Sequence, residues 1–229
     1  MSAPRVTVLP PAAKRLRNFD CWVFRNELAT PDHVAQAGET VEIVDGRGQF
    51  LAWAFYNPHS HIALRAVSMR KDHPVDDALL QARLHHAIAE RDAIAETNAK
   101  RLVFSEADGL PGLIVDQYDR WLVVQFRSAG MDRLRATVLS LLPQLIPCEG
   151  ILERSDKDFR ADEGLAPLTQ VHRGSVPERI LIHEAGLQFW VDPYQGLKTG
   201  FYLDQRPTRR LLGTWVQPDQ QVLDAFSYT

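Results

Sequence analysis

The sequence has few cysteines, no long apolar run and no large excess of charge of either sign. Its two cysteines, Cys21 and Cys148, lie far apart among 229 residues, so the sequence indicates neither a disulfide framework nor a metal site. No apolar stretch approaches the roughly 18 residues of a membrane-spanning helix, and the N-terminus lacks the apolar segment of a signal peptide. With 45% hydrophobic and 24% charged residues, the composition predicts a folded cytoplasmic protein of one or two domains.

The net charge of -3 does not by itself indicate a nucleic-acid partner, but the positive charge is unevenly distributed. Residues 1–25 contain five Lys or Arg residues and a single Asp. The candidates for contact with phosphates are Lys14, Arg15, Arg17 and Arg25. A solvated surface explains such a cluster at least as well as an RNA-facing one, so both interpretations stay open.

The first part of the chain has the pattern of a β-rich domain that ends near Ser68. The run "RVTVLP" alternates, two β-rich runs flank the turn at residues 45–48, and "IALRAVS" is another short strand. We therefore expect residues 1–68 to consist of strands and turns, arranged as a small barrel or sandwich. A helix is predicted to begin near Asp76 and to run to about Thr97, with apolar residues at helical spacing.

A second α/β unit follows the helix. "RLVFSE" and "GLIVDQYDRWLVVQF" predict strands, the last two joined by a tight turn at residues 118–120. "MDRLRATVLSLLPQLI" predicts one helix, "EGILERSD" a strand, and "SVPERILIHEAGLQFWVDP" a hairpin through residues 184–186.

Two further segments are unusual enough to identify a family. One places the rigid turn Asp-Gly-Leu-Pro-Gly at residues 108–112, and the other is "GLKTGFYLDQRPTRRLL". Together with the last residues, "VLDAFSYT", they resemble the PUA-containing class I S-adenosylmethionine-dependent RNA methyltransferases. The best match within that family is the group that methylates cytosine C5 of large-subunit ribosomal RNA.

The resemblance implies a multidomain α+β fold. Residues 1–68 correspond to a PUA-like, β-barrel RNA-binding domain, 69–100 to a linker helix, 101–190 to a small α/β domain, and 191–229 to the entry segment and first strand of a Rossmann-type catalytic domain. In the family, glycines follow that strand and approach the cofactor. We therefore expect an N-terminal fragment of a longer enzyme.

Methylation of cytosine at C5 requires a thiolate that adds to C6 and a base that removes the C5 proton. The resemblance places the catalytic cysteine beyond Thr229, so no catalytic residue is expected among these residues. Cys21 and Cys148 are expected to be small core residues, and the fragment alone is expected to be inactive.

The resemblance also implies a partial site for S-adenosylmethionine, since the segment before the first sheet strand lies beside the methionine end of that cofactor in class I methyltransferases. The candidate residues are Lys198, Thr199, Phe201, Asp204, Gln205, Arg206 and Asp224. Lys198 is suited to pair with the cofactor carboxylate, Asp204 with its ammonium and Phe201 with its sulfonium. Alternatively, Asp204 caps a helix that has Pro207 in its first turn.

Ribosomal RNA is the expected partner, and a homodimer is left open. Trp22 and Phe24 either stack on bases or fill a core. Two alternatives remain for the function. The chain is an RNA-binding module without catalysis, or it belongs to a methyltransferase with a different RNA target.

Overall fold

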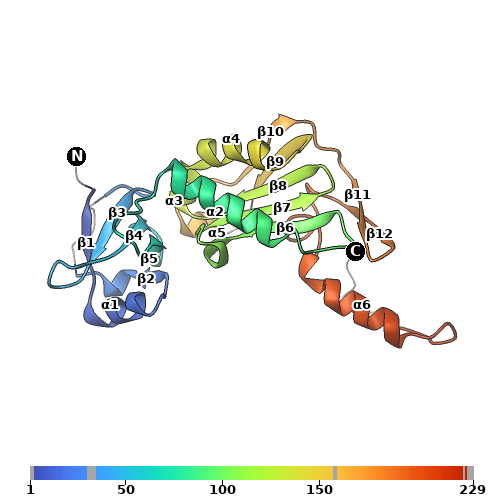
Figure 1. Ribbon diagram of the computed structural model, residues 1–229, viewed down its shortest axis with the longest axis horizontal. Helices are drawn as coiled ribbons and strands as arrows, with labels where there is room; N and C mark the ends of the chain where they lie inside the picture. The colour runs from blue at the N-terminus through green and yellow to red at the C-terminus, as the bar shows by residue number, and fades with distance from the viewer. Residues whose placement is uncertain (1–2, 30–34, 157–158, 224, 226–229) are drawn as a thin grey trace.

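The N-terminal unit is built on a curled five-stranded sheet (Figure 1). The computed structural model describes residues 3–29, 35–156, 159–223 and 225. The strand order is β1-β3-β4-β5-β2, with β1 (Arg5–Thr7), β2 (Trp22–Phe24), β3 (Thr40–Val44), β4 (Phe50–Tyr56) and β5 (Ile62–Ser68). A bridge between Val8 and Leu28 joins the segments that follow the two edge strands. The sheet therefore curls toward closure, as expected for a barrel-like unit.

A helix interrupts this unit, so the prediction that residues 1–68 contain only strands and turns was wrong. Helix α1 (Pro10–Arg17) begins with two prolines, whose fixed φ suits the first turn of a helix and whose missing N–H groups are not needed there. Ala12, Ala13 and Leu16 are buried against the inner face of the sheet. The burial of these three apolar side chains holds α1 against the core.

The second sheet is also five-stranded, with the order β10-β9-β8-β7-β6. Its strands are β6 (Ala99–Phe104), β7 (Leu113–Tyr118), β8 (Trp121–Phe126), β9 (Gly150–Ser155) and β10 (Leu168–Gly174). The pair β8–β9 is parallel and the other pairs are antiparallel. The tight turn predicted at residues 118–120 is confirmed, whereas the edge strand β10 was not predicted. The mixed α+β class is confirmed.

Helices cover one face of this sheet and bury its main core. They are α2 (Asp77–Glu90), α3 (Ala129–Arg133) and α4 (Arg135–Leu145). Asp76 begins α2 as predicted, because its carboxylate accepts a hydrogen bond from Leu79 N at 2.8 Å. Leu80 and Leu84 pack into the sheet core, and α2 crosses that sheet in Figure 1.

Two helix predictions need correction. Helix α2 ends at Glu90 rather than near Thr97, because the next residues form turns. The single helix predicted for residues 131–146 is two helices that meet at Leu134, which ends α3 and precedes α4. Val138 and Leu142 of α4 are buried.

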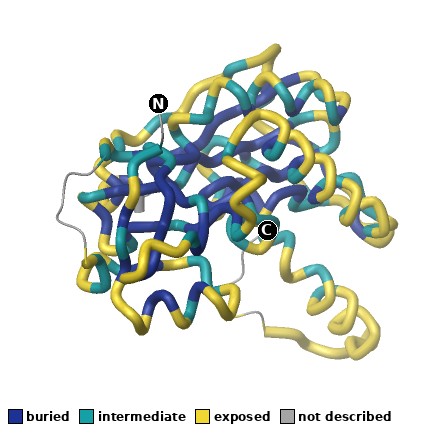
Figure 2. Tube along the Cα trace, turned by 60° about the vertical axis from the view of Figure 1, so that its left-hand side comes forward, coloured by how far each residue is buried: buried dark blue, intermediate teal, exposed yellow. Residues whose placement is uncertain are grey.

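The opposite face of the sheet is covered by the hairpin of β11 (Ile180–Glu184) and β12 (Leu187–Val191), which confirms the predicted hairpin. Val191 and Phe201 pack there against Leu152. After the short turn η3 (Leu203–Gln205), helix α6 (Arg206–Trp215) extends away from the sheet and is largely exposed (Figures 1 and 2).

The strand predicted for "VLDAFSYT" is not formed at Val222 and Leu223, which pair with no strand. Residues 224 and 226–229 lie outside the described part of the chain. Among the described residues, none of the helices combines the length and the apolar character needed to cross a bilayer.

Candidate functional site

A rigid turn at one end of the second sheet positions Phe104 and Arg127, which lie where β6 and β8 end. The turn follows η2 (Ser105–Asp108). Gly112 has a φ of +87°, and a Cβ at this position would lie 2.3 Å from the Oγ of Ser128. Its N–H donates to Ser105 Oγ at 2.8 Å, and its carbonyl accepts from Arg127 N at 2.7 Å. The rigid turn predicted for residues 108–112 is therefore confirmed, and only glycine suits its last position.

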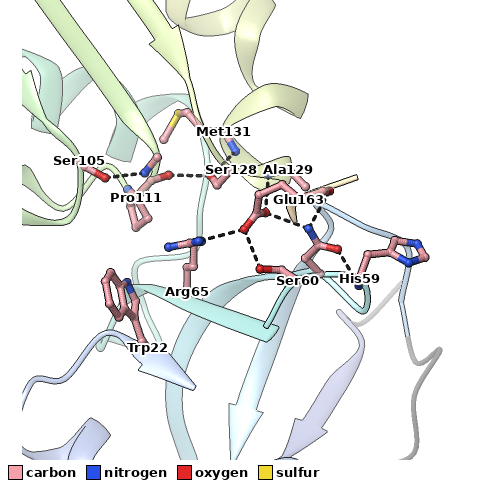
Figure 3. Close-up of polar contacts among 12 residues, drawn as sticks. Trp22, His59, Ser60, Arg65, Ser105, Pro111, Ser128, Ala129, Met131 and Glu163 are labelled. Atoms are coloured by element: carbon pink, nitrogen blue, oxygen red, sulfur yellow. Dashed lines mark hydrogen bonds and ion pairs between the residues drawn. The ribbon is translucent and has the colours of Figure 1, made fainter. Parts of the chain in front are cut away.

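A buried carboxylate joins the two units beside this turn (Figure 3). Glu163, which follows α5 (Phe159–Asp162), is only 3% exposed. Its carboxylate accepts hydrogen bonds from Asn57 Nδ2 (2.8 Å), Ser60 Oγ (2.9 Å), Arg65 Nη2 (2.9 Å) and Ala129 N (3.1 Å). The first three donors belong to the N-terminal unit and the last to α3. We call these five residues the Glu163 cluster.

The charge state of Glu163 follows from its surroundings. Burial works to raise the pKa of this carboxyl group, but the charge of Arg65 and the hydrogen bonds outweigh burial. The pKa of Glu163 consequently lies below its usual value, and the group is ionised at neutral pH. An anion that is fully coordinated in this way fixes the N-terminal unit against the second sheet.

A cleft of about 1090 Å³ opens between the two units. Its aromatic walls are formed by Trp22, Phe24, His61 and Phe104, and its cations are Arg25, Arg65 and Arg127. Trp22 Nε1 donates to Glu106 at 3.0 Å, and the Arg65 guanidinium lies 5.8 Å from the centre of the Trp22 ring. We call this space the inter-domain cleft. Three carboxylates, those of Glu106, Asp162 and Glu163, also line it. The cleft therefore offers aromatic surfaces beside charges of both signs.

A second cleft of about 790 Å³ lies on the face of the sheet that carries the hairpin. We call it the sheet-face cleft. Phe104 and Arg127 line both clefts. The two clefts therefore adjoin at the end of the sheet, next to the rigid turn, and we call this place their junction.

A polar network forms the floor of the sheet-face cleft. Arg101 donates two hydrogen bonds of 2.8 Å to the fully buried carboxylate of Asp116. The hydroxyl of Thr199 donates to Asp116 and lies 2.8 Å from the hydroxyl of Tyr118. Burial, together with the charge of Asp116, raises the pKa of Tyr118. The network thus holds the segment around Thr199 against the sheet.

Most of the residues predicted to bind the cofactor gather at this cleft. Those that line it are Lys198, Thr199, Phe201, Asp204 and Arg206. Gln205 is exposed beside it at the start of α6. Asp224 lies outside the described residues.

These residues differ in what they offer a ligand. Thr199 and Phe201 are buried, and the Arg209 guanidinium lies 4.6 Å from the centre of the Phe201 ring. Lys198 and Asp204, in contrast, are exposed charges at the rim.

The alternative role predicted for Asp204, a helix cap, was wrong. Gln205 precedes α6, and no side chain caps that helix. The placement of Pro207 in the first turn is confirmed.

The four basic residues predicted to face RNA, Lys14, Arg15, Arg17 and Arg25, lie in two places. The first three belong to α1. Arg15 is bound to Glu27 at 2.8 Å, and hydrogen bonds to acidic neighbours raise the pKa of its guanidinium. Arg17 is paired with Asp45. Arg25 lines the inter-domain cleft.

Neither cysteine has the features of a reactive thiol. Cys21 and Cys148 are partly buried and free. Burial raises the pKa of both thiols. The described residues also contain no group of three His, Cys, Asp or Glu side chains arranged to hold a metal.

Sequence reasoning did not identify as site residues Arg65, Phe104, Asp116, Arg127 or Glu163. A usable signal existed for two positions: Arg65 interrupts the apolar strand β5, and Asp116 interrupts β7. A charge inside such a strand requires a buried partner. Glu163 carries no local signal, because its partners lie far away in the sequence.

Comparison with known proteins shows what this chain is similar to. A model of the PUA-like domain matches residues 6–69. Ribosomal RNA large subunit methyltransferase I of Alteromonas mediterranea is 40% identical over 232 residues, which cover 100% of this chain and 58% of that protein. The chain resembles these methyltransferases along its whole length. This confirms the resemblance found in the sequence motifs.

A second curated relative and two solved structures show similarity over nearly the whole chain. The protein of the same name from Pseudoalteromonas atlantica is 36% identical over 98% of this chain and 58% of its own length. Among solved structures, a putative SAM-dependent methyltransferase from Streptococcus mutans has a TM-score of 0.77 at 20% identity, covering 91% of this chain and 54% of that one. A putative methyltransferase complexed with SAH has a TM-score of 0.78, also at 20% identity, covering 91% and 53%. These two similarities show the fold. The chain spans 58% of the length of the two curated relatives.

Proposed function

We propose that this chain is the RNA-recognising part of an S-adenosylmethionine-dependent methyltransferase that acts on large-subunit ribosomal RNA, at cytosine C5. The observation that carries the proposal is 40% identity to ribosomal RNA large subunit methyltransferase I over the entire chain. The PUA-like domain at residues 6–69 supports an RNA substrate.

The inter-domain cleft supports RNA recognition on physical grounds. It combines cations, which attract phosphates, with exposed rings on which bases can stack. Among the four basic residues predicted from the sequence, Arg25 is the best supported contact because it lines this cleft. Arg15 and Arg17 are already paired with carboxylates.

The sheet-face cleft supports a partial site for the cofactor. The amino-acid end of S-adenosylmethionine carries a carboxylate and an ammonium, and the rim offers Lys198 and Asp204 as opposite charges. Phe201 and Leu203 add apolar surface. The residues present therefore fit that end of the cofactor, which supplies an electrophilic methyl group when bound. We expect residues 198–206 to form one wall of the site and to bind the cofactor weakly by themselves.

We further propose that these 229 residues do not transfer a methyl group alone. Attack on C6 of cytosine needs a thiolate, and burial favours the neutral thiol of both Cys21 and Cys148. The same observation favours the second candidate function, an RNA-binding module without catalysis.

Two measurements on the purified chain test these proposals. No isotope should pass from labelled S-adenosylmethionine to large-subunit ribosomal RNA, and observed transfer would overturn the assignment of the two cysteines. Calorimetry should detect no micromolar binding of S-adenosylmethionine. Micromolar affinity would show that the cofactor has a more complete pocket than the wall described above.

A further inference from the structure

The inter-domain cleft has an arrangement of rings that core packing does not explain. Trp22 and Phe104 are 39% and 48% exposed. Phe24 and His61 form a ring pair with centroids 5.6 Å apart on the same wall. Exposed aromatic rings beside cations are the usual platform for bases that are not stacked in a duplex.

The junction of the two clefts also carries the guanidinium of Arg127, which lines both of them. Burial lowers the pKa of Arg127, the charge of Glu106 acts in the opposite direction, and the smaller effects of Arg101 and Arg65 lower it. Arg65 is already paired with Glu106 and Glu163, and Arg101 with Asp116. A phosphate at this point would therefore be attracted mainly by the charge of Arg127. Phe104 lies at the same junction, with the Arg101 guanidinium 5.1 Å from its ring centre.

We propose that an unpaired strand of RNA crosses from the inter-domain cleft into the sheet-face cleft, with a base stacked on Phe104 and a phosphate bound by Arg127. This inference rests on the proposed function, since it takes ribosomal RNA as the substrate class. The crossing leads the strand from the PUA-like domain to the cleft that holds the predicted cofactor residues. The strand must be unpaired, because the bases of a duplex stack on one another and leave no face for Phe104.

The test is fluorescence anisotropy of the whole chain with an unstructured labelled RNA and with a duplex of the same sequence. The single strand should bind more tightly. Phe104→Ala should weaken binding by roughly 5- to 150-fold, the range expected for one lost base stack. Arg127→Gln should reduce the slope of log K against log salt by about 0.7, which corresponds to one phosphate contact on a single strand.

Matched controls lie outside both clefts. Phe19→Ala removes another exposed ring, since Phe19 is 83% exposed. Lys71→Gln removes another exposed cation. Both variants should bind as the unmodified chain does.

Photo-crosslinking with 4-thiouridine RNA gives a second readout that needs no variant. Crosslinked peptides should contain Phe104 or Trp22. If the chain binds RNA but Phe104→Ala and Arg127→Gln match the controls, or if crosslinks map to α1 alone, the inference is overturned while the proposed function stands. If the chain binds no RNA, the proposed function fails with it.

Discussion

Replacing Glu163 with Gln tests whether the Glu163 cluster holds the two units together. Each carboxylate oxygen accepts two hydrogen bonds, from Arg65 and Ser60 on one side and from Asn57 and Ala129 N on the other. Gln keeps the size of the side chain but removes the charge and turns one acceptor into a donor. The two groups that donate to that oxygen would then face an N–H group and would lose their acceptor.

The size of the effect follows from burial. Removing one partner of a buried ion pair costs about 3–5 kcal/mol. Arg65 retains a second carboxylate, Glu106, at 3.1 Å, so we expect the lower end of that range. For a chain of 229 residues, about 3 kcal/mol corresponds to a fall in Tm of roughly 6–12 °C. As a control, Glu149→Gln breaks the exposed pair between Arg120 and Glu149 and should cost less than about 1 kcal/mol.

The pH dependence has a defined sign. Because the pKa of Glu163 is lowered in the folded protein from its ordinary value of 4.5, its contribution to stability is complete above that value. It is lost as the pH falls through the lower, folded-state pKa. Urea unfolding should therefore show a large difference in the free energy of unfolding between the unmodified chain and Glu163→Gln at neutral pH. This difference should shrink under acid conditions. A difference below about 1 kcal/mol at neutral pH, or one that does not change with pH, would refute this reasoning.

Three further outcomes are expected. Gly112→Ala should destabilise the protein by more than about 1 kcal/mol in urea unfolding, because of its positive φ and close contact, whereas Gly46→Ala, which meets nothing within 4 Å, should be neutral; equal effects would contradict the account of the turn. Thr199→Val should lower stability by about 1–3 kcal/mol, since it leaves buried polar groups of the floor network without a partner, and an unchanged urea midpoint would argue against that network. Cys21 and Cys148 should react slowly with iodoacetamide at neutral pH and faster only as the pH rises through their raised pKa values; rapid labelling at neutral pH would show a thiolate.

Local patterns predicted the secondary structure where a strand or helix has one apolar face. The strand "IALRAVS" matches β5, Ile62–Ser68, and the hairpin around residues 184–186 matches β11 and β12. Strand β10 was missed because it is an edge strand whose residues are mostly exposed. Helix α1 was missed because the whole of residues 1–68 was predicted to consist of strands and turns, although two prolines can begin a helix. Here, tertiary burial of Ala12 and Ala13 determines the structure.

The candidate site was predicted only where its residues are close in sequence. Residues 198–206 form one motif and gather at one cleft. The inter-domain cleft depends on pairs such as Trp22 with Glu106 and Arg65 with Glu163, whose partners are separated by 84 and 98 residues. Such contacts depend on how the two units pack, which periodicity and composition do not encode. The charge cluster on α1 was visible in the sequence, but its acidic partners were not.

The central claim is that this chain recognises large-subunit ribosomal RNA. The most direct test is the equilibrium affinity of the purified chain for unmodified large-subunit ribosomal RNA, compared with small-subunit ribosomal RNA over a range of salt concentrations. We predict tighter binding to the large-subunit RNA, with an affinity that falls as salt rises because phosphate contacts release counterions. Equal affinity for the two RNAs, or no binding at low salt, would contradict the claim.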